Sequence, residues 1–125
     1  MNAAPEVQGI GISTKAIKQE TLINNTSSAT TINEFPALAG KGIRIKYKIV
    51  RGTLDRTGEF VISASTTAVA SDDTFTESGA TVGVTLSAAL DNKDSTSGNE
   101  TVAFKYVTTS TGTDATIDYQ TTIIA

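Results

Sequence analysis

The chain has no cysteine, no histidine and no tryptophan, and only two prolines among its 125 residues. Without cysteine there is no disulfide, no thiol nucleophile and no thiolate metal site. Without histidine, the commonest general base and the commonest metal ligand are missing. These absences leave few routes to catalysis, so we expect a protein that is not an enzyme and that holds no cofactor or metal.

Long apolar runs and an excess of positive charge are also missing. No stretch approaches the roughly 20 apolar residues of a membrane-spanning helix. Residues 1–6 have neither the basic region nor the apolar core of a signal peptide. The net charge of −3 and the pI of about 4.8 disfavour nucleic acid or an anionic membrane as a partner. The length predicts one domain.

Serine and threonine are abundant, making up about a quarter of the chain. Threonine, valine, isoleucine and tyrosine favour half-buried strands joined by short turns. The clearest strand is predicted over residues 41–51, where side chains alternate between two faces. One face is apolar and the other basic: Ile43, Ile45, Tyr47 and Ile49 against Arg44, Lys46 and Lys48.

Six further segments show a similar alternation. They are residues 16–24, 30–38, 58–65, 81–90, 101–108 and 115–124. The alternation slips near Thr21, where we expect a bulge, and breaks at Pro36. Because turn signals recur about every 8–12 residues without helices, we predict an all-β fold, an antiparallel β-sandwich of seven or eight strands. Its predicted inward residues are Ile45, Tyr47, Ile49, Phe60, Ile62, Val84, Leu86, Phe104, Tyr106, Ile117 and Tyr119.

The connections are predicted from their polar and glycine residues. Residues 24–28 are expected to form a hairpin loop, residues 55–58 a tight turn, and residues 110–114 the last hairpin turn. Residues 66–79 and 91–100 are expected to be longer polar loops. The glycine-rich residues 1–13 are predicted to form an N-terminal arm, followed by one sandwich domain over residues 14–125.

Acidic residues cluster at Asp72, Asp73 and Glu77. Such a cluster could hold Ca²⁺ or supply the paired carboxylates of a glycoside hydrolase. An acidic, solvated loop anchored by Phe75 is the favoured interpretation. Residues 91–100 do not match a calcium loop, because a lysine occupies the third position and the glycine falls eighth instead of sixth.

Half of the basic residues lie in one predicted strand: Lys41, Arg44, Lys46, Lys48 and Arg51. A basic row can contact phosphates. Because no aromatic residue lies on this face, we instead expect the row to pair with Glu20, Glu59 or Asp118, or to be solvated.

Three stretches in this order are similar to those of a known class of proteins. The first is Tyr47-Lys48-Ile49-Val50-Arg51-Gly52 with Arg56-Thr57-Gly58-Glu59-Phe60-Val61-Ile62. The second is Ser71-Asp72-Asp73-Thr74-Phe75-Thr76-Glu77-Ser78-Gly79 with Gly83-Val84-Thr85-Leu86-Ser87. The third runs from Val102 to Tyr119. Together they cover about two-thirds of the chain, which resembles small β-domains of bacteriophage virion proteins, notably tail-fibre and related structural components.

The resemblance implies a non-enzymatic structural component of the virion, either tail- or fibre-associated or head-decorating. It implies assembly as a symmetric homo-oligomer, a trimer by comparison with fibres, with other virion proteins as partners. The arm, with Val7, Ile10 and Ile12, would then cover a sheet edge of a neighbouring copy. One alternative is a carbohydrate- or host-receptor-binding module that recognises a host surface glycan through residues 66–79 or 91–100. Another is a Ca²⁺-dependent hydrolase.

Overall fold

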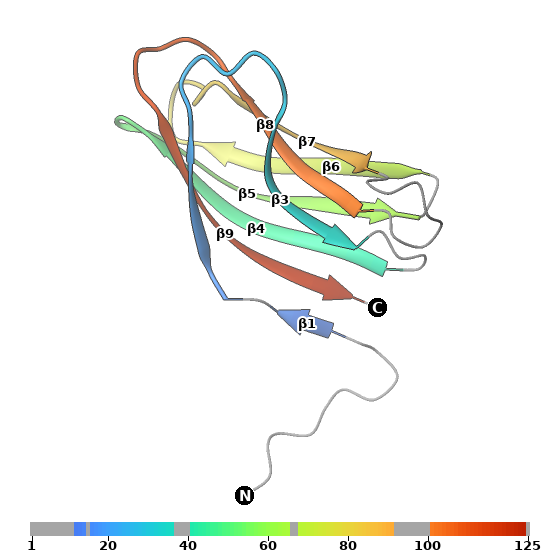
Figure 1. Ribbon diagram of the computed structural model, residues 1–125. Coiled ribbons are helices and arrows are strands. Elements are labelled where there is room, and N and C mark those ends of the chain that lie inside the picture. The colour runs from blue at the N-terminus through green and yellow to red at the C-terminus, as the bar shows by residue number, and fades with distance from the viewer. Residues whose placement is uncertain (1–11, 15, 37–40, 66–67, 92–100, 125) are drawn as a thin grey trace, which may run out of the picture.

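The structure, a computed structural model, describes residues 12–14, 16–36, 41–65, 68–91 and 101–124 (Figure 1). These residues contain strands and no helix. The strands are β1 (Ile12–Thr14), β2 (Lys18–Leu22), β3 (Thr30–Pro36), β4 (Lys41–Arg51), β5 (Leu54–Ala64), β6 (Val69–Glu77), β7 (Val84–Asp91), β8 (Thr101–Thr108) and β9 (Ala115–Ile124).

The strands form two antiparallel sheets, so the predicted β-sandwich is confirmed (Figure 1). The larger sheet has the order β1-β9-β4-β5-β6, and β2 also pairs with β9. β1 and β2 pair with different parts of β9, both on the edge away from β4. They therefore share one strand position. The smaller sheet has the order β3-β8-β7, which brings the described total to eight strand positions.

The core lies between the sheets and is built by alternation along each strand. All of the predicted inward residues are buried: Ile45, Tyr47, Ile49, Phe60, Ile62, Val84, Leu86, Phe104, Tyr106, Ile117 and Tyr119. Phe104 of the smaller sheet packs against two rings of the larger sheet, with ring centroids 5.2 Å from Phe60 and 5.9 Å from Tyr119. Such aromatic pairs add about 0.5–1.5 kcal/mol each beyond the area they bury.

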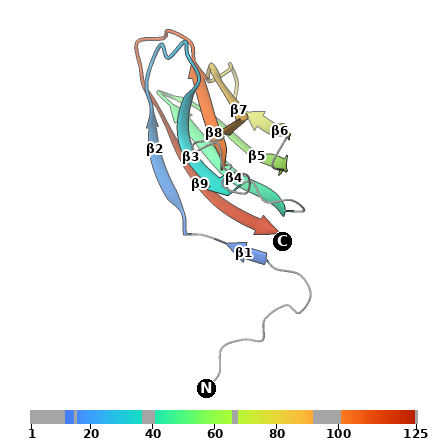
Figure 2. The ribbon, with the colours of Figure 1, turned by 45° about the vertical axis from the view of Figure 1, so that its right-hand side comes forward.

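β6 is an edge strand of the larger sheet (Figure 2), and its residues are exposed or only partly buried. β6 packs against β7, the edge of the smaller sheet. Phe75 shares the inner face of β6 with Asp73 and Glu77, and its side chain remains 43% exposed. One side of the sandwich is therefore open between β6 and β7.

Two local predictions around β5 and β6 were wrong. Residues 66–79 were expected to be a loop, but most of them form β6. The residues of β6 that face inward are mainly polar, because the smaller sheet does not cover them fully, and the apolar alternation is therefore absent. The tight turn expected at residues 55–58 lies inside β5. The real turn is Gly52–Thr53, where the positive φ of Gly52 is typical of a type II′ hairpin.

Two expected hairpins are connections between the sheets. Residues 24–28 lead from β2 in the larger sheet to β3 in the smaller one, and residues 110–114 lead from β8 back to β9. The polar and glycine residues of a turn do not reveal whether the chain stays in one sheet or changes sheets, so these predictions were wrong.

The predicted boundary of the N-terminal arm also changes. Ile12 and Ser13 belong to β1 and pair with Ile124 and Ile123 of the same chain. Residues 1–11, which hold the rest of the expected arm, lie outside the described residues. So do residues 92–100 of the second expected loop.

The irregularities of β2 and β3 differ in part from the prediction. The expected bulge at Thr21 is absent, since β2 pairs in regular register with β9. The irregularity instead lies between Thr31 and Asn33 in β3. The predicted break at Pro36 is confirmed, because β3 ends there.

Candidate functional site

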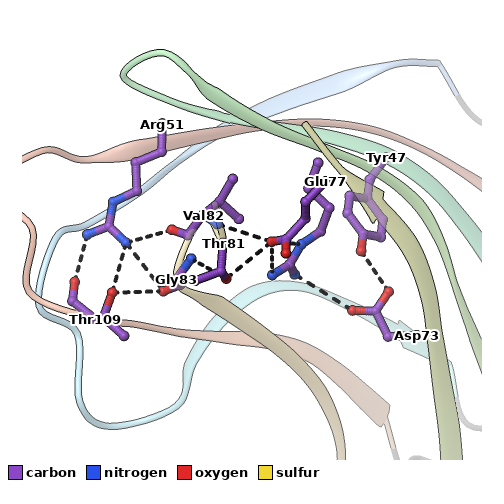
Figure 3. A network of polar contacts seen from close by, with 9 residues as sticks. Tyr47, Arg51, Asp73, Glu77, Thr81, Val82, Gly83 and Thr109 are labelled. Carbon is purple, nitrogen blue, oxygen red and sulfur yellow. Dashed lines mark hydrogen bonds and ion pairs between the residues drawn. The ribbon is translucent and has the colours of Figure 1, made fainter. Parts of the chain in front are cut away.

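Charged side chains gather on the inner face of the larger sheet at the open side of the sandwich (Figure 3). Tyr47 comes from β4, Arg56 from β5, and Asp73 and Glu77 from β6. Arg56, Asp73 and Phe75 line one wall of a groove of about 470 Å³, and residues of β7 and its preceding segment line the other. The alternation of a strand explains the placement, since Arg56 shares the face of the buried Phe60 four residues on.

Arg56 is the central cation of this site and is only 3% exposed. Its Nε and Nη2 atoms donate to Oε2 of Glu77 at 3.1 and 2.9 Å. Its Nη1 lies 3.9 Å from Oδ2 of Asp73, and its Cζ lies 3.9 Å from the centroid of the Phe75 ring. A buried charge needs such partners, because leaving it unpaired costs several kcal/mol.

Glu77 links β6 to the segment that enters β7. Its Oε2 also accepts the backbone N–H of Val82 at 3.0 Å and the hydroxyl of Thr81 at 3.2 Å. Burial raises the pKa of this carboxyl, but the bond from Val82 and the interaction with Arg56 outweigh burial and hold the pKa below its usual range. Glu77 is therefore an ionised anchor.

Tyr47 and Asp73 form the inner end of the site. The Tyr47 hydroxyl donates to Oδ1 of Asp73 at 2.7 Å. Burial, and then the bond to Asp73, raise the pKa of Tyr47 far above its usual value, so the hydroxyl stays protonated. Burial also raises the pKa of Asp73 and exceeds the opposite effects of Tyr47 and Arg56. The Tyr47 hydroxyl is therefore not a base at neutral pH, and the Asp73 carboxyl is held by Tyr47 and Arg56.

Arg51 organises a second polar cluster where several connections meet (Figure 3). It is 4% exposed. Its guanidinium donates to the backbone oxygens of Thr113 at 2.8 Å, Val82 at 3.0 Å and Thr109 at 2.6 Å. It also donates to Oδ1 of Asn24 at 2.7 Å, which accepts two further backbone N–H groups from residues 111 and 112. One side chain thus joins three connections that leave or enter different strands.

The acidic cluster predicted from the sequence is divided by the strand. Asp72 pairs with Val61 on the outer face of the sheet, and Asp73 points inward. Asp73 and Glu77 are bound by Tyr47 and Arg56. Across the described part of the chain, no three acidic residues lie close enough to hold a metal ion. The prediction of a solvated loop was wrong. The geometry of Asp72, Asp73 and Glu77 offers neither a calcium site nor a free pair of carboxylates.

The basic row is confirmed in part. Arg44, Lys46 and Lys48 are exposed on the outer face of β4, and Arg44 lies 3.2 Å from Glu59. Lys48 is the cross-strand neighbour of Asp118, as expected. Glu20 instead pairs with Ile117 of β9, away from the row, and the side chain of Lys41 lies outside the described residues. Arg51 does not belong to the row, because it is buried.

The burial of Arg51 and Arg56 was not predicted from the sequence. A signal was present in each case. Arg51 is separated by an even number of residues from the inward Ile49 and Ile45, and Arg56 likewise from Phe60. Strict alternation therefore placed both guanidinium groups on the inner face. They were overlooked because a buried arginine is rare unless it is paired.

Comparisons with family models, curated proteins and solved structures find no match to this chain. Over the described residues, no helix is long and apolar enough to span a membrane. The chemistry of the site itself must therefore carry the functional argument.

Proposed function

We propose that this chain is a non-enzymatic structural component of a bacteriophage virion, tail- or fibre-associated or head-decorating, that acts by symmetric assembly. The resemblance noted in the sequence supports this proposal. Its three stretches fall on β4–β5, on β6 with the start of β7, and on β8–β9, which together form most of the core.

The observation that carries the proposal is that the buried guanidinium groups of Arg51 and Arg56 bind groups of the same chain. The guanidinium of Arg51 donates to backbone oxygens of the same chain, and that of Arg56 donates to a carboxylate of the same chain. Over the described residues, no buried side-chain nitrogen or oxygen lacks a hydrogen-bond partner. Catalytic sites instead keep an acid, base or nucleophile available to a substrate. These charges fix connections between strands, which is what a building block of a larger particle requires.

The glycan-binding alternative has less support. Most of residues 66–79 form β6 instead of a loop. The guanidinium of Arg56 already lies over one face of the Phe75 ring, an aromatic group of the kind on which sugars stack. The second expected loop lies largely outside the described residues. A glycan array with the purified protein tests this alternative, and a structural subunit should bind none of the sugars.

The proposal is tested by locating the protein on particles. Antibodies raised against the purified chain, detected with gold in electron micrographs of virions, should label one fixed position on each particle. Labelling of the head surface or of the tail distinguishes the two placements. Virions without label, from a preparation in which the protein is otherwise detected, would contradict the proposal.

A further inference from the structure

Strands at the edges of the sheets differ in how well they resist pairing with another chain. Natural edge strands are protected by charges, proline or register irregularities. β2 is short and carries Lys18 and Glu20. β3 ends in Pro36 and is irregular at Asn33. β6 carries three carboxylates within nine residues.

β7 has none of these protections. Residues Val84–Asp91 read VTLSAALD, so the only charge is at the last position. The strand contains no proline and pairs with β8 without a register shift. Within the described residues, no strand pairs with the other edge of β7. A row of main-chain donors and acceptors is therefore presented without a barrier to a further strand.

The groove beside this edge has room for such a strand. The larger sheet has five strand positions and the smaller three, and β7 packs against β6 and β5. A strand added about 4.8 Å beyond β7 would lie along the groove that Asp73 and Phe75 of β6 line. It would cover Phe75, and it would complete the burial of Ala88 and Leu90, which are only partly buried.

We propose that an extended segment within residues 1–11 of a second copy of this chain adds to the edge of β7. The inference rests on the proposed function, because it describes how copies assemble. After Pro5 and Glu6 the segment reads Val7-Gln8-Gly9-Ile10-Gly11 and has no charge, as β7 has none before its last residue. Main-chain hydrogen bonds would supply affinity, and one apolar side chain would face Phe75, Val7 in one register and Ile10 in the other, because the two point to opposite faces of a strand.

The reach of the segment indicates exchange between copies. Eleven extended residues span at most about 36–40 Å, and six residues paired along β7 use about 20 Å of this. The remaining five would span about 17 Å. β1 and β6 are separated by four strand spacings, about 19 Å, and the step between sheets adds about 10 Å. A chain cannot therefore reach its own β7 edge and also pair along it.

The test uses the absence of cysteine from the chain, which makes introduced thiols unique. Full-length protein carrying Gln8→Cys or Gly9→Cys is mixed with full-length protein carrying Thr85→Cys, and a short bismaleimide is added. Two adjacent arm positions are used so that one of them shares the face of Thr85 in either register. The matched control is Thr31→Cys on β3, which is equally an exposed, outward threonine beside β8.

We expect at least ten-fold more cross-linked heterodimer with Thr85→Cys than with Thr31→Cys, measured as intact mass. Equal yields, or no heterodimer with either, would overturn the assignment of β7. If native mass spectrometry still shows an oligomer of the unmodified protein, only the docking site is wrong. If the unmodified protein is monomeric and virions carry no label, the proposed function fails as well.

Discussion

Asp73 and Glu77 lie four residues apart on the same face of β6, yet their pKa values shift in opposite directions. Burial acts on both carboxyls. For Glu77 it is outweighed by the N–H of Val82 and by Arg56, whereas for Asp73 it prevails over Tyr47 and Arg56. The two groups are therefore expected to contribute to stability with opposite signs as the pH changes.

Replacing these carboxyls one at a time should separate the two effects. Glu77 has a lowered folded-state pKa, so its stabilisation is present above its ordinary value of 4.5 and is lost as the pH falls through the folded-state pKa. Glu77→Gln should lower the free energy of unfolding by about 1–3 kcal/mol at pH 7, and by less below pH 4.5.

Asp73→Asn is the matched comparison. The raised pKa of Asp73 means that its charged form disfavours folding at neutral pH, so removing the charge while keeping an acceptor for Tyr47 should leave stability at pH 7 unchanged or increased. Urea unfolding of both variants at pH 7 and at acid pH measures these differences. A loss for Asp73→Asn equal to that for Glu77→Gln at pH 7 would contradict the assignment.

At Gly58 the structure leaves no room for a side chain. It pairs with Tyr47 on one side and Phe75 on the other. A Cβ at Gly58 would lie 2.6 Å from the backbone oxygen of Thr74 and 2.8 Å from the Tyr47 hydroxyl, which crosses this position to reach Asp73. Gly58→Ala should therefore cost about 1–3 kcal/mol through overpacking.

Gly42 provides the control for this substitution. It also lies in a strand, but a Cβ there would meet nothing within 4 Å. Gly42→Ala should be neutral or slightly stabilising, because alanine restricts the unfolded chain. Thermal unfolding of both variants decides the matter, and equal melting temperatures would show that the contact at Gly58 relaxes freely.

At the scale of elements, prediction from sequence succeeded where both sheets cover a strand. β4 could be predicted because its buried face is apolar and its outer face basic. β6 could not, because its inner residues face a groove and are polar. The burial of the two arginines was not predicted, although alternation contained the signal, and their partners on distant connections, such as Asn24 for Arg51, could not be predicted. Long-range pairing is set by topology, which the pattern of one strand does not contain.

The extent to which each strand is covered by its neighbours also predicts which strands unfold locally first. β4 and β9 lie inside the larger sheet and bury most of their inward side chains. β2 and β6 lie at its edges, and their residues are mostly exposed. Amides of β4 and β9 should exchange with solvent most slowly, near the rate set by global unfolding, and those of β2 and β6 faster. Native-state hydrogen exchange measures this order. Slower exchange in β6 than in β4 would show that the edge is covered in solution.

For the whole molecule, the clusters around Arg51 and Arg56 hold strands and connections of the sandwich together through contacts within the chain. The groove beside β7 leaves one edge of the smaller sheet accessible. Under the proposed function, this combination gives a rigid body with one defined place for a neighbour. Among the described residues, stability comes from the apolar core and from satisfied polar groups.

Removal of the N-terminal segment is the most direct test of assembly. The deletion should cover residues 2–11 and stop there, because Ile12–Thr14 forms β1 and protects the edge of β9. If the segment joins copies, the full-length protein should have the mass of an oligomer, a trimer by the resemblance, and the truncated protein that of a monomer with the same melting temperature. Light scattering at several concentrations measures both masses. A protein that is monomeric at high concentration with or without these residues, and that enters particles equally well in both forms, would refute a role of the segment in assembly.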